Sequence, residues 1–219
     1  MSKAETAESE KSDKSDKSDK SDKSDKALFI QRLIAFIIDM FLISMVASLI
    51  AFPFVDSESV TKLQDGMVEV SEKYMNLEIS VNDYFDESMP LLYQVAKKSG
   101  VLTLVTLFLE ILYFIVYQYY NNGQTIGKKI MMIKVVATDD QMTVNQMLLR
   151  TLIIDSILVD MVIFGFVIFT NQSIYFYGTL VFELIQYIVI FVSVVMIIFG
   201  KNGKGLHDLI SHTEVIKQN

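Results

Sequence analysis

The sequence predicts an all-α integral membrane protein with four transmembrane helices, both chain termini in the cytoplasm, and a partly helical extracytoplasmic loop after the first span. Composition gives the first indication, because 52% of the 219 residues are hydrophobic and the mean hydropathy is +0.39. Such values are too apolar for an ordinary soluble domain. Long apolar runs give the second, since a run of about 18 or more apolar residues is long enough to span a bilayer. The expected spans are 28–52, 100–120, 150–169 and 174–199.

A polar tail precedes the first span. Within residues 1–26, the tripeptide Lys-Ser-Asp repeats five times over 11–25. Alternating charges with serine cannot form a hydrophobic core, so we expect this tail to be disordered. Its mixed charge is not typical of a signal peptide. The membrane domain is expected over 27–216, followed by a short tail at 217–219.

The first span contains two charged residues on one face. Arg32 and Asp39 are seven residues apart, close to two helical turns, so both side chains project in the same direction. Arg32 lies near the start of the span, from where its long side chain can reach the headgroups. Asp39 lies deep in the apolar run, where a bare charge costs about 2.5–3.5 kcal/mol. We therefore expect other helices to surround Asp39.

An acidic insert separates the first two spans. Residues 55–99 are expected to form a small extracytoplasmic module. Apolar side chains recur there at steps of three and four residues, which predicts an amphipathic helix over about 58–75. The residues that make this pattern are Val60, Leu63, Met67, Val70 and Tyr74.

The cytoplasmic loop at 121–149 contains a possible strand and a helix start. Its apolar stretch Ile130–Val136 fits either a short strand or an interfacial segment. Thr143 followed by Gln146 predicts a capping box at the start of the next helix. The GQTIGKK stretch at 123–129 lacks the glycine spacing and the Ser or Thr of a phosphate-binding loop, so a turn with lysine anchors is expected.

Basic residues set the predicted orientation. The 121–149 loop and the C-terminal tail carry lysines close to the spans, whereas the link at 170–173 has none. Lys97 and Lys98, near the second span, weaken this asymmetry. A multi-pass protein of the cell (plasma) membrane, with both termini in the cytoplasm, satisfies the pattern.

Acidic residues inside the expected spans outnumber the arginines near them. Two arginines, Arg32 and Arg150, lie close to the cytoplasmic boundary. If the acids converge, some must be protonated or a cation must lie among them, as a proton- or cation-coupled transporter requires. Two alternatives remain open: carboxyl groups that hydrogen-bond the helices together, and a face that docks a protein partner. The acids are Asp39, Glu110, Asp155, Asp160 and Glu183, and all but Asp155 lie in the central third of a span.

Several other function classes are disfavoured. The chain has no cysteine and two histidines, His207 and His212, so we expect no metal site and no thiol chemistry. No nucleophile–base pair can be recognised, so we expect neither an enzyme nor a cofactor. A net charge of −7 argues against a nucleic-acid partner.

Three stretches resemble the RDD family of small bacterial membrane proteins. They are QRLIAFIID with Arg32 and Asp39, the 123–136 loop with the segment ending at Arg150, and GLHDLISHTEV at 205–215. The family is named for one arginine and two aspartates, which by position would be Arg32, Asp39 and Asp208. The resemblance covers most of 27–216, without the acidic insert. It departs from the family at the second methionine of KKIMMIKV, where a glycine is common.

The resemblance implies a transport protein, because sodium–proton antiport is attributed to some members. Arg32 and Asp208 would both lie at the cytoplasmic face, so we predict a structural salt bridge between them. Our hypothesis is a cation/proton transporter contacting the bilayer, a monovalent cation or proton, and other copies of itself in a homo-oligomer. The alternative is a non-transporting accessory or scaffold protein that docks an envelope partner. The candidate ion-binding residues are Asp39, as the main carboxylate, with Glu110, Asp160 and Glu183 in support.

Overall fold

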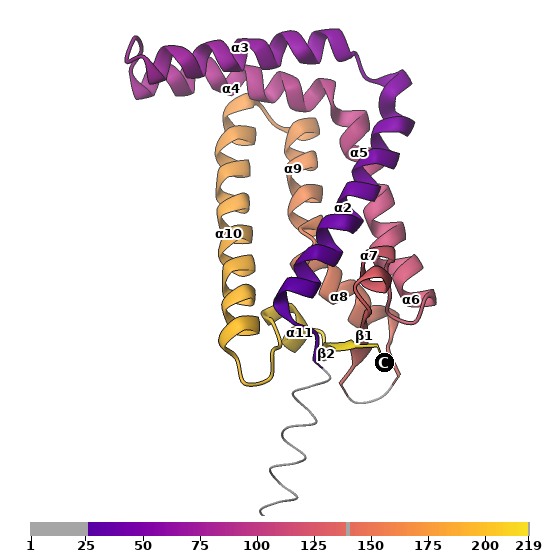
Figure 1. The fold of residues 1–219 in the computed structure, drawn as a ribbon. Coiled ribbons are helices and arrows are strands. Elements are labelled where there is room, and N and C mark those ends of the chain that lie inside the picture. Colours follow the sequence, from indigo (N-terminus) through magenta and orange to yellow (C-terminus); the bar gives the residue numbers. More distant parts are fainter. Residues whose placement is uncertain (1–25, 139–140, 219) are drawn as a thin grey trace, which may run out of the picture.

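A computed structural model describes residues 26–138 and 141–218, and the predicted disordered tail, apart from Lys26, lies outside these residues. The described chain is mostly helical (Figure 1). Within these described residues, three helical segments are long and apolar enough to cross a membrane: Phe29–Phe54, Gly100–Tyr120 and Gln172–Phe199. A fourth span is possible if Val144–Ile154 and Ile157–Phe169, which meet at an angle of 64°, count as one broken crossing. The protein is therefore a helical membrane protein with three to four candidate spans.

The first span consists of α2 (Phe29–Ala51) and a short 3-10 turn, η1 (Phe52–Phe54). Its buried positions recur every four residues and three of them are alanines, which lets α5 and α7 approach closely. Asp39 lies in the middle of this face and is fully buried. The buried residues of α2 are Ala35, Asp39, Ile43, Ala47 and Ala51.

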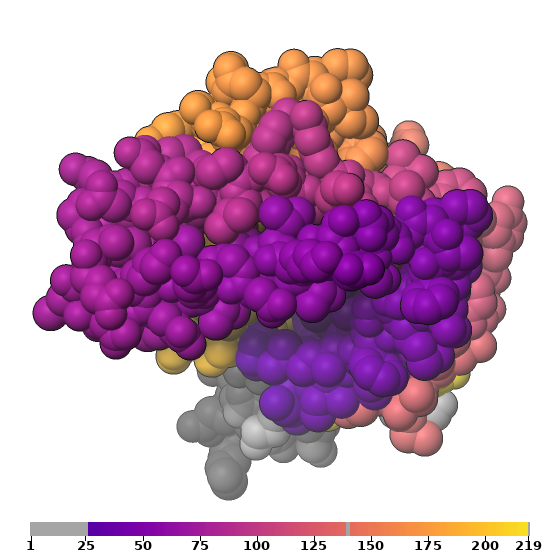
Figure 2. Space-filling view, turned by 90° about the horizontal axis from the view of Figure 1, so that it is seen from above, coloured from indigo at the N-terminus to yellow at the C-terminus, as the bar shows by residue number. Residues whose placement is uncertain are grey.

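A helical hairpin lies across one end of the bundle. It consists of α3 (Ser57–Met75) and α4 (Val81–Lys98). The helix expected over 58–75 is present as α3, whereas α4 was not anticipated from the sequence. Figure 1 shows both helices nearly perpendicular to α10, and Figure 2 shows them stretched across this end of the molecule. We call this pair the α3–α4 hairpin; its second helix packs on the ends of α9 and α10.

The second span changes its winding beside Glu110. It runs through α5 (Gly100–Glu110), the π-helix η2 (Ile111–Tyr117) and α6 (Gln118–Tyr120). A π-helix is wider than an α-helix, so every side chain after Glu110 is rotated relative to the positions that regular helical spacing predicts. The directions of the side chains after Glu110 therefore cannot be predicted from helical periodicity alone.

The third hydrophobic segment is broken rather than continuous over 150–169. It consists of α8 (Val144–Ile154) and α9 (Ile157–Phe169), and the chain turns at Ser156, whose φ is 61°. The capping box predicted at Thr143 and Gln146 is confirmed: the Gln146 N–H donates to Thr143 Oγ1 at 3.3 Å. The last long helix, α10 (Gln172–Phe199), runs back antiparallel to α9, with which it forms a close pair.

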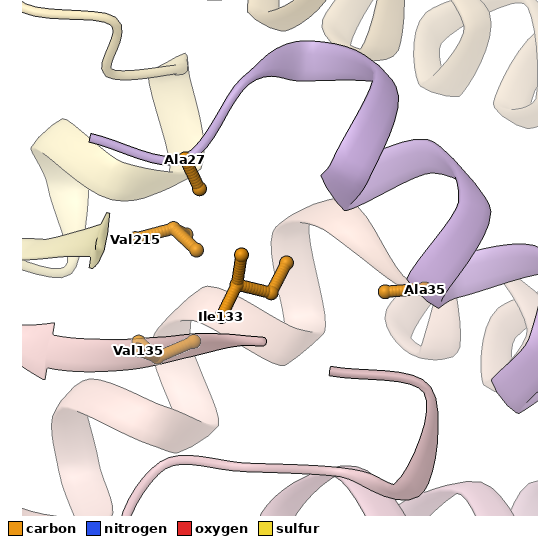
Figure 3. Packing of buried hydrophobic residues seen from close by; sticks show 5 residues of the cluster. All are labelled: Ala27, Ala35, Ile133, Val135 and Val215. Atoms are coloured by element: carbon orange, nitrogen blue, oxygen red, sulfur yellow. The ribbon is translucent and has the colours of Figure 1, made fainter. Parts of the chain in front are cut away.

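The other end of the bundle is closed by a small two-stranded sheet. Strands β1 (Ile133–Ala137) and β2 (Thr213–Lys217) pair antiparallel, with Val135 opposite Val215. Residues 133–136 of the stretch thus belong to a strand, as the first of the two alternatives left open by the sequence predicted, whereas Ile130 ends α7. Two short helices flank the sheet, α7 (Ile126–Ile130) and α11 (Leu206–Ile210). Figure 3 shows the apolar cluster that joins it to α2: Ala27, Ala35, Ile133, Val135 and Val215.

Candidate functional site

Asp39 is held by three donors from the protein itself. Its Oδ1 accepts from the hydroxyl of Tyr113 at 2.6 Å and from the backbone N–H of Gly127 at 2.7 Å. Its Oδ2 accepts from Thr125 Oγ1 at 2.5 Å. Hydrogen bonds to an ionised carboxylate are strong, and three of them compensate much of the cost of burying the charge. The carboxylate therefore ties α2, η2 and the start of α7 together.

Gly127 is what allows α7 to reach Asp39. A Cβ atom at this position would lie 2.1 Å from the carbonyl oxygen of Ala35 and 2.9 Å from Asp39 Cγ. Thr125 completes the arrangement, because its hydroxyl also caps α7 by accepting from the Lys128 N–H at 3.2 Å. The GQTIGKK stretch is thus a carboxylate-binding turn, which goes beyond the turn with lysine anchors expected from its sequence.

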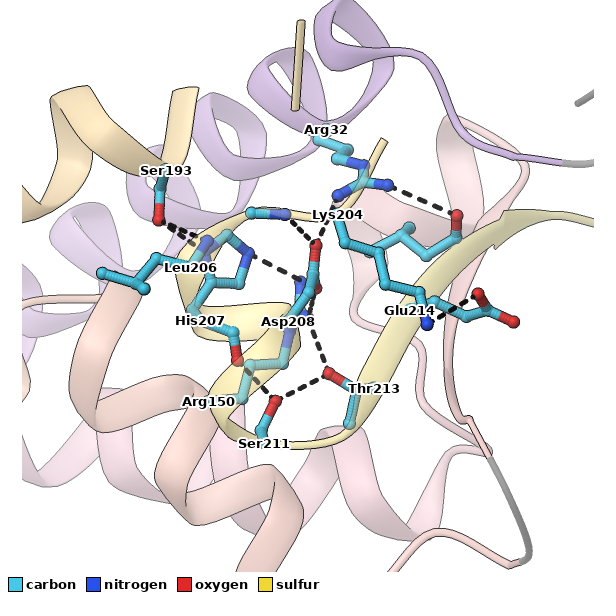
Figure 4. A network of polar contacts seen from close by, with 12 residues as sticks. Arg32, Arg150, Ser193, Lys204, Leu206, His207, Asp208, Ser211, Thr213 and Glu214 are labelled. Carbon is cyan, nitrogen blue, oxygen red and sulfur yellow. Dashed lines mark hydrogen bonds and ion pairs between the residues drawn. The ribbon is translucent and has the colours of Figure 1, made fainter. Parts of the chain in front are cut away.

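Asp208 forms the centre of a second polar cluster, shown in Figure 4. Arg32 Nη1 donates to its Oδ2 at 2.8 Å, and Arg150 Nη1 donates to its Oδ1. The Gly205 N–H adds a bond of 2.9 Å to Oδ2. These contacts join α2, α8 and α11, so the Arg32–Asp208 pair expected from the sequence is in contact, together with Arg150.

The surroundings of this cluster fix its charge state. Burial alone would raise the pKa of Asp208, but the guanidinium groups of Arg150 and Arg32 hold it well below its ordinary value. Burial lowers the pKa of His207 to about 3, and the charge of Arg150 acts in the same direction. His207 is therefore neutral near pH 7, with its Nδ1 3.2 Å from Ser193 Oγ of α10.

A cavity of about 230 Å³ lies between α2, α8 and α10, next to both clusters. Its walls are largely apolar, with charged groups from several elements facing in. The helix break at Asp155 and Ser156 also lines it. Within the described part of the chain, no side chain hydrogen-bonds to the Asp155 carboxylate. The charged residues that line this cavity are Arg32, Asp39, Lys128, Arg150 and Asp155.

Three further acids lie about three turns from the hairpin end of their helices: Glu110 on α5, Asp160 on α9 and Glu183 on α10. Glu110 is 4% exposed, and its Oε2 has no hydrogen-bond partner in the described structure. It lies within electrostatic reach of Asp160 and Asp155, and Asp160 lies within reach of Glu183. We call Glu110, Asp155, Asp160 and Glu183 the acidic group.

A second cavity of about 420 Å³ opens beside α10, under the α3–α4 hairpin. It is lined by Glu183, by Thr179 and by apolar and aromatic side chains such as Leu92 and Tyr175. Each cavity is lined by one member of the acidic group: Glu183 lines the one near the hairpin, and Asp155 lines the one near the small sheet.

The four proposed ion-binding acids do not meet at one point. Asp39 is engaged by Tyr113, Thr125 and Gly127, and Glu183 is exposed on α10. Shared depth in the membrane was the basis for expecting convergence, and depth does not determine rotation about the helix axis. Among the described residues, no three acidic or histidine side chains are close enough to hold a metal ion.

A family model described as the RDD family matches residues 26–212. The chain belongs to the RDD family. No curated protein and no solved structure matches the chain. The matched range of this RDD protein includes both polar clusters, because Arg32, Asp39, Arg150 and Asp208 all lie within it.

Three residues of this RDD protein make contacts that the sequence did not predict. Arg150 is a second partner of Asp208; its sequence signals were its place near the expected cytoplasmic boundary and at the end of a family-like stretch. Tyr113 binds Asp39 from the π-helix, a contact that regular helical spacing does not predict. Lys128 points into the cavity near the small sheet, where its Nζ donates to Gln118 Oε1 at 2.9 Å.

Proposed function

We propose that this RDD protein is a proton-coupled transporter of monovalent cations, of the sodium–proton antiport type, without enzymatic activity. One observation carries the proposal: Glu110 is buried at mid-depth, with Oε2 unpartnered, among other acids. A carboxyl group in that position must bind a proton or a cation to be stable. Exchange of one for the other is the chemical step that antiport requires.

The positions of the two cavities support a transport route. The acidic group lies between them, so a cation crossing the bundle would pass carboxylate oxygens on its way. At the break between α8 and α9, the backbone departs from regular helical hydrogen bonding. Irregular backbone at membrane depth is tolerated where it lines a cavity, as this break does.

We assign the central binding role to Glu110 and Asp160, with Asp155 and Glu183 on either side. Asp39 has a different role in this proposal, because its oxygens already accept three hydrogen bonds and it anchors α7. With no three described acids grouped closely, a bound cation would take its other ligands from water or backbone carbonyls.

The charge distribution favours placing the small sheet in the cytoplasm and the α3–α4 hairpin outside, in the plasma membrane. Lysines gather around the sheet end, on α7, on β1 and β2, and beside α11. The hairpin is acidic, although Lys97 and Lys98 end α4. Positive residues near the ends of spans favour the cytoplasmic side. A homo-oligomer remains part of the proposal, because α10 is largely uncovered in the single chain.

Proteoliposomes with an internal pH dye test the proposal. An imposed sodium gradient should move protons in vesicles with the unmodified protein, and Glu110→Gln should reduce that flux at least about tenfold, since a neutral amide cannot exchange a proton for a cation. Glu58→Gln is the matched control, because Glu58 is an exposed acid on α3. No flux with sodium, lithium or potassium, or normal flux in Glu110→Gln, would contradict the proposal.

A non-transporting accessory role is the second candidate, favoured by the tip of the α3–α4 hairpin. Met75, Leu77 and Val81 are exposed there, with Leu77 at 89%. Exposed apolar side chains on a projecting hairpin are typical of a docking surface. Leu77→Glu should leave cation flux unchanged under the transport proposal. Two results together would favour the accessory role. Cells with Leu77→Glu would have the same phenotype as cells without the protein, and vesicles with either the unmodified protein or Leu77→Glu would show no cation flux.

A further inference from the structure

We propose that Lys128 is an internal counter-ion that competes with the transported cation for Asp155. In the cation-free protein the Lys128 ammonium neutralises the Asp155 carboxylate across the cavity near the small sheet. A monovalent cation that enters this cavity replaces that charge, and Lys128 releases its proton. This inference rests on the proposed transport function and adds the coupling group to it.

Lys128 is fixed in position without a direct ion pair. Its Nζ donates to Gln118 Oε1 at 2.9 Å and lies 5.9 Å from the centre of the Phe114 ring. Gln118 and Phe114 both line the cavity, as does Asp155. In the described part of the chain, no carboxylate lies within ion-pair distance of Lys128 Nζ. The ammonium and Asp155 thus face the same space and leave room for an ion or water between them.

The charges that line the cavity, together with Asp208, which binds both arginines beside it, balance only when Lys128 is protonated. The charges that act on Lys128 are those of Asp39 on α2, Arg150 on α8, Asp155 at the helix break and Asp208 on α11. His207, which is close enough for Lys128 to lower its pKa, is neutral near pH 7. Three cations, Arg32, Lys128 and Arg150, then oppose three anions, Asp39, Asp155 and Asp208. An added cation would leave one uncompensated positive charge in a largely apolar space, which is costly.

Lys128 is the group best suited to restore the balance. An arginine does not lose its proton in proteins, and both arginines are bound to Asp208. Burial lowers the pKa of Lys128 to about 8, and the charge of Arg150 acts in the same direction. A lysine can therefore give up its proton near neutral pH when a second cation arrives. One cation bound then releases one proton, so the exchange is electrically neutral.

Sodium binding to the purified, full-length protein tests this assignment. Radiolabelled sodium is the probe, in a scintillation proximity assay at constant ionic strength with choline chloride. In the unmodified protein, sodium affinity should rise about tenfold per pH unit below pH 8 and level off above it, because one proton competes with one cation. Lys129→Gln is the matched control, since Lys129 is an exposed neighbour on the same helix.

Two variants at position 128 should behave in opposite ways. Lys128→Gln removes the competing charge, so its sodium affinity at about pH 7 should equal that of the unmodified protein at about pH 9, with little change between. Lys128→Arg keeps the charge at all pH values, so its affinity at about pH 9 should fall at least about tenfold. Adding sodium to a weakly buffered sample should release about one proton fewer per bound sodium in Lys128→Gln than in the unmodified protein.

Each other result has a distinct meaning. A Lys128→Gln variant with an unchanged pH profile and unchanged proton release would overturn the role of Lys128 and leave the transport proposal standing. Loss of sodium binding in Lys128→Gln, with native size-exclusion and thermal unfolding profiles, would overturn it in favour of a positioning role. Absence of sodium binding to the unmodified protein at any pH would overturn both proposals.

Discussion

Arg32 and Asp208 are 176 positions apart in the sequence, yet Arg32 Nη1 lies 2.8 Å from Asp208 Oδ2. The same carboxylate binds Arg150, so one buried acid joins the first span, the start of the broken span and the C-terminal segment. Asp208 is fully buried, and the side chains of Arg32 and Arg150 are 11% and 8% exposed. The stability of this end of the bundle therefore depends on Asp208.

Asp208→Asn should lower the free energy of unfolding by about 3–5 kcal/mol, because it leaves two buried guanidinium groups without a counter-charge. Denaturant unfolding in detergent micelles measures the change. Glu214→Gln is the control, because it removes only the partly exposed ion pair with Lys204, and it should cost less than about 1 kcal/mol. Equal stability of both variants would contradict this account of Asp208.

Exchanging the charges of Arg32 and Asp208 should not restore the stability of the protein. In the double variant Arg32→Asp with Asp208→Arg, the new arginine at 208 would face Arg150, which approaches Asp208 from α8. Like charges in a buried space repel strongly. Thermal unfolding of the double variant should therefore show no gain over Asp208→Arg alone; a recovery to native stability would mean that Arg150 does not contact position 208.

Acid should destabilise the protein through His207 before it affects Asp208. The pKa of His207 is about 3 in the folded protein and about 6.5 when unfolded, so between these values the unfolded chain binds more protons. The contribution of His207 to the free energy of unfolding is therefore fully present above about pH 6.5 and is lost as the pH decreases toward 3. The lowered pKa of Asp208 removes stability only below about 3.8, in the more acidic range.

His207→Gln isolates this effect. The unfolding temperature of the unmodified protein minus that of the variant is measured from about pH 7 to pH 4.5. This difference should become smaller as the pH falls, because glutamine does not titrate. His212→Gln serves as the comparison, since His212 lies in the turn before β2. A difference that stays constant over this range would show that His207 is not held in its neutral form.

Gly127→Ala should strongly destabilise the protein, because the added Cβ would meet the Ala35 carbonyl at 2.1 Å and force α7 away from α2. The cost should reach at least about 2 kcal/mol, as for overpacking at a site that cannot relax. Gly165→Ala is the control: its Cβ would have nothing within 4 Å, and alanine favours the helix. Similar unfolding temperatures for both variants would contradict the close approach at Gly127.

Asp39→Asn should loosen the turn that precedes α7. In the unmodified protein the Thr125 hydroxyl donates to Asp39 Oδ2. An asparagine keeps one oxygen for Tyr113 and Gly127 but presents an amide NH₂ group to that hydroxyl. Losing this charge-assisted bond should cost about 1.5–3 kcal/mol. Hydrogen exchange of the backbone N–H of Gly127 is the measurement, and slow exchange as in the unmodified protein would contradict the anchoring role of Asp39.

Local sequence patterns determined much of the architecture. The apolar runs predicted membrane-crossing helices, and the Thr143–Gln146 pattern predicted the start of α8, because helix length and capping depend on neighbouring residues. The charges of Arg32 and Asp208 also indicated a pairing at one end of the bundle. Each of these inferences required only composition, spacing or depth.

Tertiary structure decided which charges meet. Depth placed Asp39 and Glu110 at one level, but rotation about each helix axis separates them: Asp39 binds α7, and Glu110 faces Asp155 and Asp160. The π-helix at Ile111–Tyr117 and the break at Ser156 depend on packing between helices, so regular periodicity could not reveal them. The sequence supplied the excess of buried acids, and only the packed fold determined that Asp39 is satisfied while Glu110 is not.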